Sequence, residues 1–123
     1  MDYKKIFKII LIIFIAIFLG TVIDYIVHQT DPSFSVPFSY FPHKIFYGTL
    51  WAAVAFFVAR LFTKKWLELA FICSFAPALI LQTIYFIQMH LAPDVVLLFL
   101  ILHFFMFLAP MIPLFKKYQN LFV

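Results

Sequence analysis

Apolar residues occur in four long runs along this chain, separated by short polar or basic segments. The runs cover about residues 6–27, 44–62, 66–89 and 95–114. Each is close to the roughly 20 residues that a helix needs to cross a bilayer. The first run carries no charge between Lys8 and Asp24. The pattern predicts an all-α polytopic integral membrane protein, with four transmembrane helices and a single transmembrane domain over residues 1–123.

The basic residues predict the orientation of these helices. Eight of the nine Lys and Arg residues fall on one side of the predicted membrane: Lys4, Lys5, Lys8, Arg60, Lys64, Lys65, Lys116 and Lys117. Only Lys44 falls on the other side. Basic residues in short loops mark the cytoplasmic side, so we expect both termini in the cytoplasm. The connections after the second and third runs are short, which favours an antiparallel bundle.

Composition supports a membrane protein and excludes several other classes. The chain is 67% hydrophobic and 11% charged, which is too apolar for a soluble domain of 123 residues. The positive charges lie next to the predicted membrane, where they favour anionic lipids and do not indicate nucleic-acid binding. Cys73 is the single cysteine, which excludes an intramolecular disulfide.

One connection, at about residues 28–43 between the first two runs, is longer than the others. It contains three prolines, which disfavour a helix, and aromatic residues that are too apolar for a freely solvated loop. We expect it to lie in the outer membrane interface or to fold over the mouth of the bundle. The sequence leaves open whether it is a lid, a contact surface for a partner or an interfacial anchor.

Polar residues gather at the ends of the runs that face outward in this topology. Asp24 and His28 are four residues apart and therefore share a helix face. Imidazole and carboxylate ligands suit a divalent metal. The candidate metal-ligating set is Asp24, His28, His43, His90 and Asp94.

Three other interpretations of this outer cluster remain open. Asp24 is a candidate proton-carrying group, with His28 as its relay partner. The cluster is also a candidate site for a lipid headgroup or another substrate. In the plainest interpretation these residues solvate the outer surface, and Asp24 pairs with Lys44 or His28.

His103 lies near the middle of the fourth run, and Gln82 lies at a comparable depth in the third. Polar side chains inside a membrane face the bundle and find partners there, which predicts an interhelical hydrogen bond between the two. A haem with His103 as its single ligand, or shared between subunits, is the alternative. No second histidine lies at a matching depth.

Small residues recur along the second run at a spacing of four, three and four: Gly48, Ala52, Ala55 and Ala59. This spacing places them on one stripe, where another helix backbone approaches closely. The stripe predicts a packing seam, either inside the bundle or with another subunit.

The sequence contains no catalytic motif and no cofactor fingerprint, so it favours a protein that is not an enzyme and leaves catalytic residues unknown. Our first hypothesis is a non-catalytic subunit or accessory component of a larger membrane complex. Its partners are membrane lipids and other integral-membrane subunits or further copies of itself. The alternative is a stand-alone binder, transporter or enzyme for a lipid or small apolar molecule, acting at the outer cluster.

Overall fold

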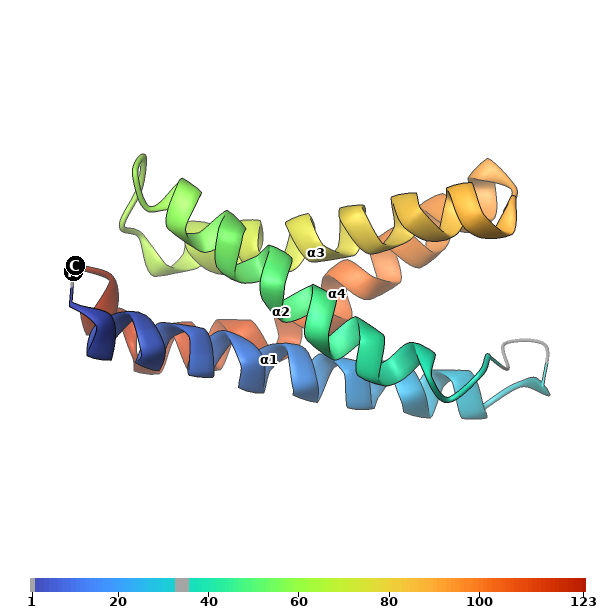
Figure 1. Ribbon diagram of the computed structural model, residues 1–123, viewed down its shortest axis with the longest axis horizontal. Helices are drawn as coiled ribbons and strands as arrows, with labels where there is room; N and C mark the ends of the chain where they lie inside the picture. The colour runs from blue at the N-terminus through green and yellow to red at the C-terminus, as the bar shows by residue number, and fades with distance from the viewer. Residues whose placement is uncertain (1, 33–35) are drawn as a thin grey trace.

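The computed structural model describes residues 2–32 and 36–123, which form an up-and-down bundle of α-helices (Figure 1). The helices are α1 (Tyr3–Gln29), α2 (Tyr40–Ala59), α3 (Trp66–Met89) and α4 (Pro93–Lys117), and a short 3₁₀ helix, η2 (Gln119–Phe122), follows them. Helices α1 and α3 each pack against both α2 and α4. Both termini and the α2–α3 connection lie at one end of the bundle, which we call the terminal end (Figure 1). We call the opposite end the loop end.

Three of the helices, α1, α3 and α4, are long and apolar enough to cross a membrane. The prediction of an all-helical protein with membrane-spanning helices is confirmed to this extent. Helix α2 also has 20 residues, but His43 and Lys44 near its start lower its hydropathy.

The helix ends differ from the predicted ones by a few residues. Helix α1 begins three residues earlier because Asp2 caps it, accepting a hydrogen bond of 2.8 Å from the Lys5 backbone N–H. Helix α2 begins at Tyr40, with Pro42 in its first turn, where a proline removes no helical hydrogen bond. The connection between α1 and α2 is therefore residues 30–39, shorter than the predicted 28–43. Residues 33–35 of the predicted aromatic segment lie outside the described residues.

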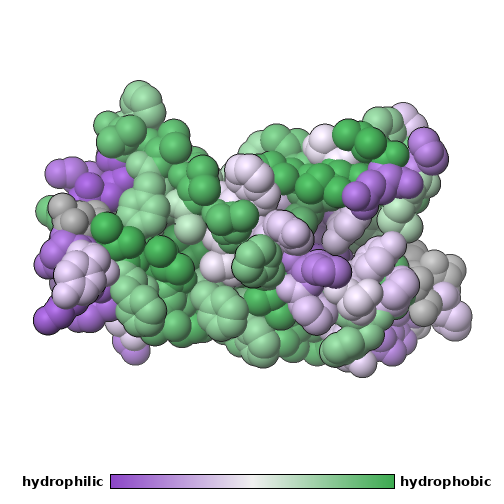
Figure 2. Space-filling view, viewed as in Figure 1, coloured by the Kyte–Doolittle hydropathy of each residue, from purple (hydrophilic) through white to green (hydrophobic). Residues whose placement is uncertain are grey.

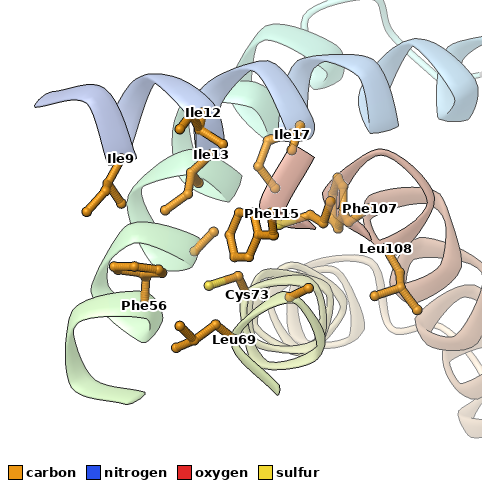
Figure 3. Close-up of a cluster of buried hydrophobic side chains, with 14 of the residues drawn as sticks. Ile9, Ile12, Ile13, Ile17, Phe56, Leu69, Cys73, Phe107, Leu108 and Phe115 are labelled. Atoms are coloured by element: carbon orange, nitrogen blue, oxygen red, sulfur yellow. The ribbon is translucent and has the colours of Figure 1, made fainter. Parts of the chain in front are cut away.

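The hydrophobic core lies mostly in the half of the bundle near the terminal end, and Figure 3 shows a close-up of its side chains. All four helices contribute fully buried side chains to it, including Ile13, Phe56, Leu69 and Phe115. Phe122 of η2 is also buried, with its ring centroid 5.2 Å from that of Phe56 and 5.0 Å from that of Phe115.

The small residues of α2 form close contacts inside the bundle. Ala52 is fully buried, and Ala59 is nearly so, whereas Ala55 is half-buried. A Cβ atom added at Gly48 would lie 3.0 Å from a methyl carbon of Ile17 on α1. Much of the stripe is therefore occupied by helices of the same chain.

The outer surface of the bundle is largely apolar. Large hydrophobic side chains are exposed on every helix, for example Phe7, Val58, Ile87 and Phe105, each more than half exposed. On the face shown in Figure 2, hydrophilic residues gather at the terminal end, the surface next to them is mostly hydrophobic, and the surface towards the loop end is paler. Such a surface requires an apolar solvent, in agreement with the helices that are suited to a membrane.

Candidate functional site

An ion pair is buried between α1 and α2, in the half of the bundle near the loop end. The Lys44 Nζ atom lies 2.5 Å from Asp24 Oδ2, and the two side chains are 3% and 2% exposed. Burial of one charge without the other is expensive, so each residue requires its partner. Lys44 is the one basic residue outside the terminal end, and this pairing explains how α2 accommodates it.

Two more helices complete the network around this pair. His103 of α4 places its Nε2 atom 3.2 Å from Lys44 Nζ and 3.5 Å from Asp24 Oδ1. Gln82 of α3 places its side-chain nitrogen 3.3 Å from His103 Nδ1. Thus α1, α2, α3 and α4 each contribute one buried polar side chain at the same level of the bundle. We call Asp24, Lys44, Gln82 and His103 the polar network.

The contact of His103 with the backbone of α4 indicates a proton on Nδ1. His103 Nδ1 lies 2.7 Å from the carbonyl oxygen of Phe99, an atom that only accepts hydrogen bonds. Nε2 lies within reach of the Lys44 ammonium group, which is a donor, and of Asp24 Oδ1, which is an acceptor. With the proton on Nδ1, the amide of Gln82 presents its oxygen to Nδ1, since the two ends of an amide are assigned from their surroundings.

Lys44 has unused hydrogen-bonding capacity. An ammonium group has three N–H donors, of which two are directed at Asp24 and His103. Within residues 2–32 and 36–123, no hydrogen-bonded acceptor is found for the third. Aromatic rings lie beside the charge, with the Phe41 and Tyr85 ring centroids 5.5 and 5.6 Å from Nζ.

A cavity of about 430 Å³ extends from the polar network towards the loop end. This volume lies in the range of about 300–1,000 Å³ that is typical of small-molecule sites. Lys44, Gln82 and His103 form its inner end, because each lies deeper along its helix than the other lining residues. The remaining lining is mostly apolar or aromatic: His28, Val36, Tyr40, Tyr85, Met89, Leu91, Val95 and Phe99.

The charged groups that line the cavity are all positive. Lys44 is its only fully charged side chain, and no carboxylate of the described residues lines the cavity. Asp24 lies behind Lys44 and is not part of the lining. The two histidines, His28 and His103, add positive charge when protonated. The cavity therefore presents hydrogen-bond donors at its inner end, with apolar walls around them.

His28 connects the polar network with the mouth of the cavity. Its Nε2 atom lies 3.3 Å from Asp24 Oδ1, one helical turn away on α1. Its ring stacks on that of Phe99, with centroids 6.5 Å apart, and meets the ring of Phe41 edge-on at 5.7 Å. The imidazole is thus held between α1, α2 and α4.

The structure brings together only part of the candidate metal-ligating set. Asp24 and His28 are in contact, whereas His43, His90 and Asp94 are exposed. His43 contacts Tyr47 on the outside of α2, and His90 ends α3 in a left-handed conformation with φ of 52°. In the part of the chain that the structure describes, no group of three or more His, Cys, Asp or Glu side chains is placed to hold a metal ion. The cation next to Asp24 is the ammonium group of Lys44.

Sequence reasoning separated residues that the fold joins. His103 and Gln82 were assigned to the membrane interior, and Asp24 and Lys44 to the outer face, but all four belong to one network. The aromatic lining residues were not identified, since Tyr85 and Phe99 do not differ in sequence from the many other aromatic residues. The spacing of Gln82 and Tyr85 could have indicated this lining, because residues three apart lie on one face of α3.

Comparisons of the chain with protein families, with curated proteins and with solved structures find no match. The functional argument therefore depends on the geometry of the site.

Proposed function

We propose that this protein is a small integral-membrane binder that holds an amphiphile by its anionic head. The head, a carboxylate or a phosphate, occupies the inner end of the cavity. It accepts a hydrogen bond from the third N–H group of Lys44. The first carbons of the apolar part, next to the head, lie against Met89, Val95 and Phe99. The observation that carries the proposal is a buried ammonium group with a donor to spare at the end of an apolar cavity.

A full membrane arrangement belongs to this proposal. Helix α2 serves as the fourth span, because its two most polar residues do not both face lipid: Lys44 is buried, and only His43 is exposed near the helix start. The rest of its exposed face is apolar, including Phe46, Leu50 and Val54. Eight basic residues at the terminal end support a cytoplasmic location for both termini. The cavity then opens towards the outer side.

Competition binding with ligands that share one chain and differ in the head tests the proposal. The purified protein in mild detergent is loaded with a fluorescent fatty acid, which is displaced by hexadecanoate, hexadecyl phosphate, hexadecanol or hexadecylamine. Hydrogen bonds to charged groups contribute about 1.5–3 kcal/mol, so an anionic head should bind roughly 10- to 100-fold more tightly than the alcohol. The amine should bind least. Comparison of the acid with the phosphate identifies which anion the site prefers.

Two variants serve as test and control. Asp24→Asn combined with Lys44→Gln removes both buried charges without leaving either unpaired, and it should abolish the preference for anionic heads. Lys64→Gln removes the same positive charge from an exposed position at the terminal end and should leave the preference unchanged. Equal binding of acid and alcohol by the wild-type protein would contradict the proposal, as would an unchanged preference in the double variant.

Membership in a larger membrane complex is a second proposal. The extensive apolar surface, which lipids or other membrane subunits can cover, supports it. The small-residue stripe of α2 gives it less support, because Gly48 and Ala52 are buried within the chain itself. Native mass measurement in mild detergent separates the cases: a monomer that carries only lipid contradicts this second proposal, and a stable assembly supports it.

A further inference from the structure

Two tyrosines form a wall between the cavity and a second hollow. The rings of Tyr40 on α2 and Tyr85 on α3 are stacked, with centroids 5.9 Å apart and an angle of 9° between their planes. Both residues line the cavity that contains Lys44, and both also line a hollow of about 470 Å³ between α2 and α3. We call this hollow the lateral groove. Its other lining residues are His43, Tyr47, Leu81, Ile84 and Gln88.

The lateral groove lies on the outside of the bundle. His43, Tyr47, Ile84 and Gln88 are exposed, and they belong to the outer faces of α2 and α3. In Figure 2 the surface between these two helices, towards the loop end, is paler than the hydrophobic surface in the middle of the molecule. With α2 as the fourth span, as proposed above, this groove faces lipid rather than the aqueous phase.

Polar groups mark a path from this groove to Lys44. His43 and Gln88 lie at the groove, the two tyrosines form the wall, and Gln82 and His103 lie behind it beside Lys44. Polar residues on a lipid-facing surface are rare unless they have a partner or a function. Apolar Leu81 and Ile84 lie along the same groove, so it offers a place for a hydrocarbon chain next to a passage for a polar head.

We propose that the lateral groove is the entrance through which an acyl-chain lipid with an anionic head passes from the bilayer into the cavity. This inference rests on the function proposed above and adds its source and route. The head passes between Tyr40 and Tyr85 to reach Lys44, and the chain remains in the groove against Leu81 and Ile84. The rings close the passage when it is empty.

The wall is suited to open transiently. Tyr40 is the first residue of α2 and follows the connection from α1, so its backbone lies at a helix end and not within a helix. Tyr85 lies within α3 and is held by the Lys44 charge, 5.6 Å from its ring centroid. An anionic head that approaches Lys44 competes with the Tyr85 ring for the ammonium group. It therefore weakens the cation–π contact that holds Tyr85 in place. Binding and opening are therefore linked through one ammonium group.

Photo-crosslinking of the full chain in liposomes tests the route. Two hexadecanoate probes are used, one with a diazirine beside the carboxylate and one with a diazirine near the chain end. We expect the first to label Met89, Val95 or Phe99 in the cavity and the second to label Leu81 or Ile84 in the groove. A different result is that the first probe labels the cavity while the second labels only the mouth, at Val36 or Leu91. This result overturns the lateral route but agrees with the proposed binding function.

Other outcomes of this experiment are also decisive. If neither probe labels the cavity, both the route and the binder are wrong. If the chain-end probe labels exposed Leu79 on α3 as strongly as Ile84, the groove holds only surrounding membrane lipid and the route is again overturned.

A kinetic measurement separates an entrance from a mere contact. Ile84→Trp narrows the groove and should slow uptake of hexadecanoate from liposomes by about tenfold, equivalent to about 1.4 kcal/mol on the barrier. Release should slow as well, because the same passage serves both directions. Leu79→Trp adds the same bulk to an exposed position of α3 outside the groove and should change neither rate. Equal rates for the two variants would overturn the proposed entrance.

Discussion

The buried pair of Asp24 and Lys44 predicts a specific pattern of stabilities among three variants. Lys44→Met removes the ammonium group and leaves Asp24 buried, with the two histidines as its remaining ion-pair partners among the described residues. Asp24→Asn removes the carboxylate and leaves Lys44 with His103 as its remaining hydrogen-bond partner among the described residues. Each single change leaves one buried charge without its counter-charge. The double variant that combines Asp24→Asn with Lys44→Met leaves neither charge.

The expected magnitudes follow from this geometry. Removal of one partner of a buried ion pair destabilises a protein by about 3–5 kcal/mol, whereas replacement of both by apolar or neutral groups is often close to neutral. The double variant should therefore be more stable than either single variant. An exposed pair provides the matched control: Lys65 and Glu68 lie 3.5 Å apart and are 79% and 51% exposed. Glu68→Gln should leave the free energy of unfolding nearly unchanged, because water screens this exposed pair.

The assay is reversible unfolding of each variant in mixed micelles of mild detergent and dodecyl sulfate. Fluorescence of Trp51 and Trp66, together with helical circular dichroism, reports the transition. Two results would refute the reasoning. One is a cost below about 1 kcal/mol for both single variants, the value expected of a hydrated surface pair. The other is a double variant whose destabilisation equals the sum of the two single ones, which means that the charges do not interact.

Three further predictions concern packing and topology. Gly20→Ala should destabilise the bundle by about 1–3 kcal/mol, because its Cβ would lie 2.7 Å from a ring carbon of Phe107 on α4; dodecyl sulfate unfolding measures this, and a neutral effect would show that α1 and α4 are not so close. Phe122→Ala should cost about 3–5 kcal/mol, since the side chain is fully buried, and it should make η2 susceptible to protease; unchanged digestion would show that η2 does not pack on the core. In a cysteine-free background in cells, a cysteine at Lys64 should react only with a membrane-permeant reagent and one at Asp94 also with an impermeant reagent, and the reverse pattern would invert the proposed orientation.

Much of the fold follows from the hydrophobic runs. The runs at 66–89 and 95–114 correspond closely to α3 and α4, because a helix that contacts lipid must be apolar around most of its circumference. Helix ends were less predictable. Asp2 extends α1 through a cap, and Pro42 lies inside α2 rather than before it, since a proline in the first turn is compatible with a helix.

The site was less accessible from sequence than the fold. Asp24 and Lys44 are charged residues within apolar runs, so the sequence indicates their pairing as one possible arrangement. Their level in the bundle was not evident, because helix tilt and stagger decide whether His103 meets them, and neither is encoded in a hydropathy pattern. The apolar lining of the cavity was also hidden: Val95 and Met89 resemble lipid-facing residues until the packing of four helices separates the inner face from the outer one.

The most direct test of the account is a crystal structure of the protein grown with 2-bromohexadecanoate, whose bromine marks the carbon next to the carboxylate. We predict an anomalous peak inside the cavity, close to Lys44 and His103, with the chain leading past Tyr85 towards Leu81. The same peak should be absent in the Asp24→Asn, Lys44→Gln double variant. Bromine located only on the outer surface of the helices, or unchanged in that variant, would contradict the claim that the buried ammonium group binds the anionic head.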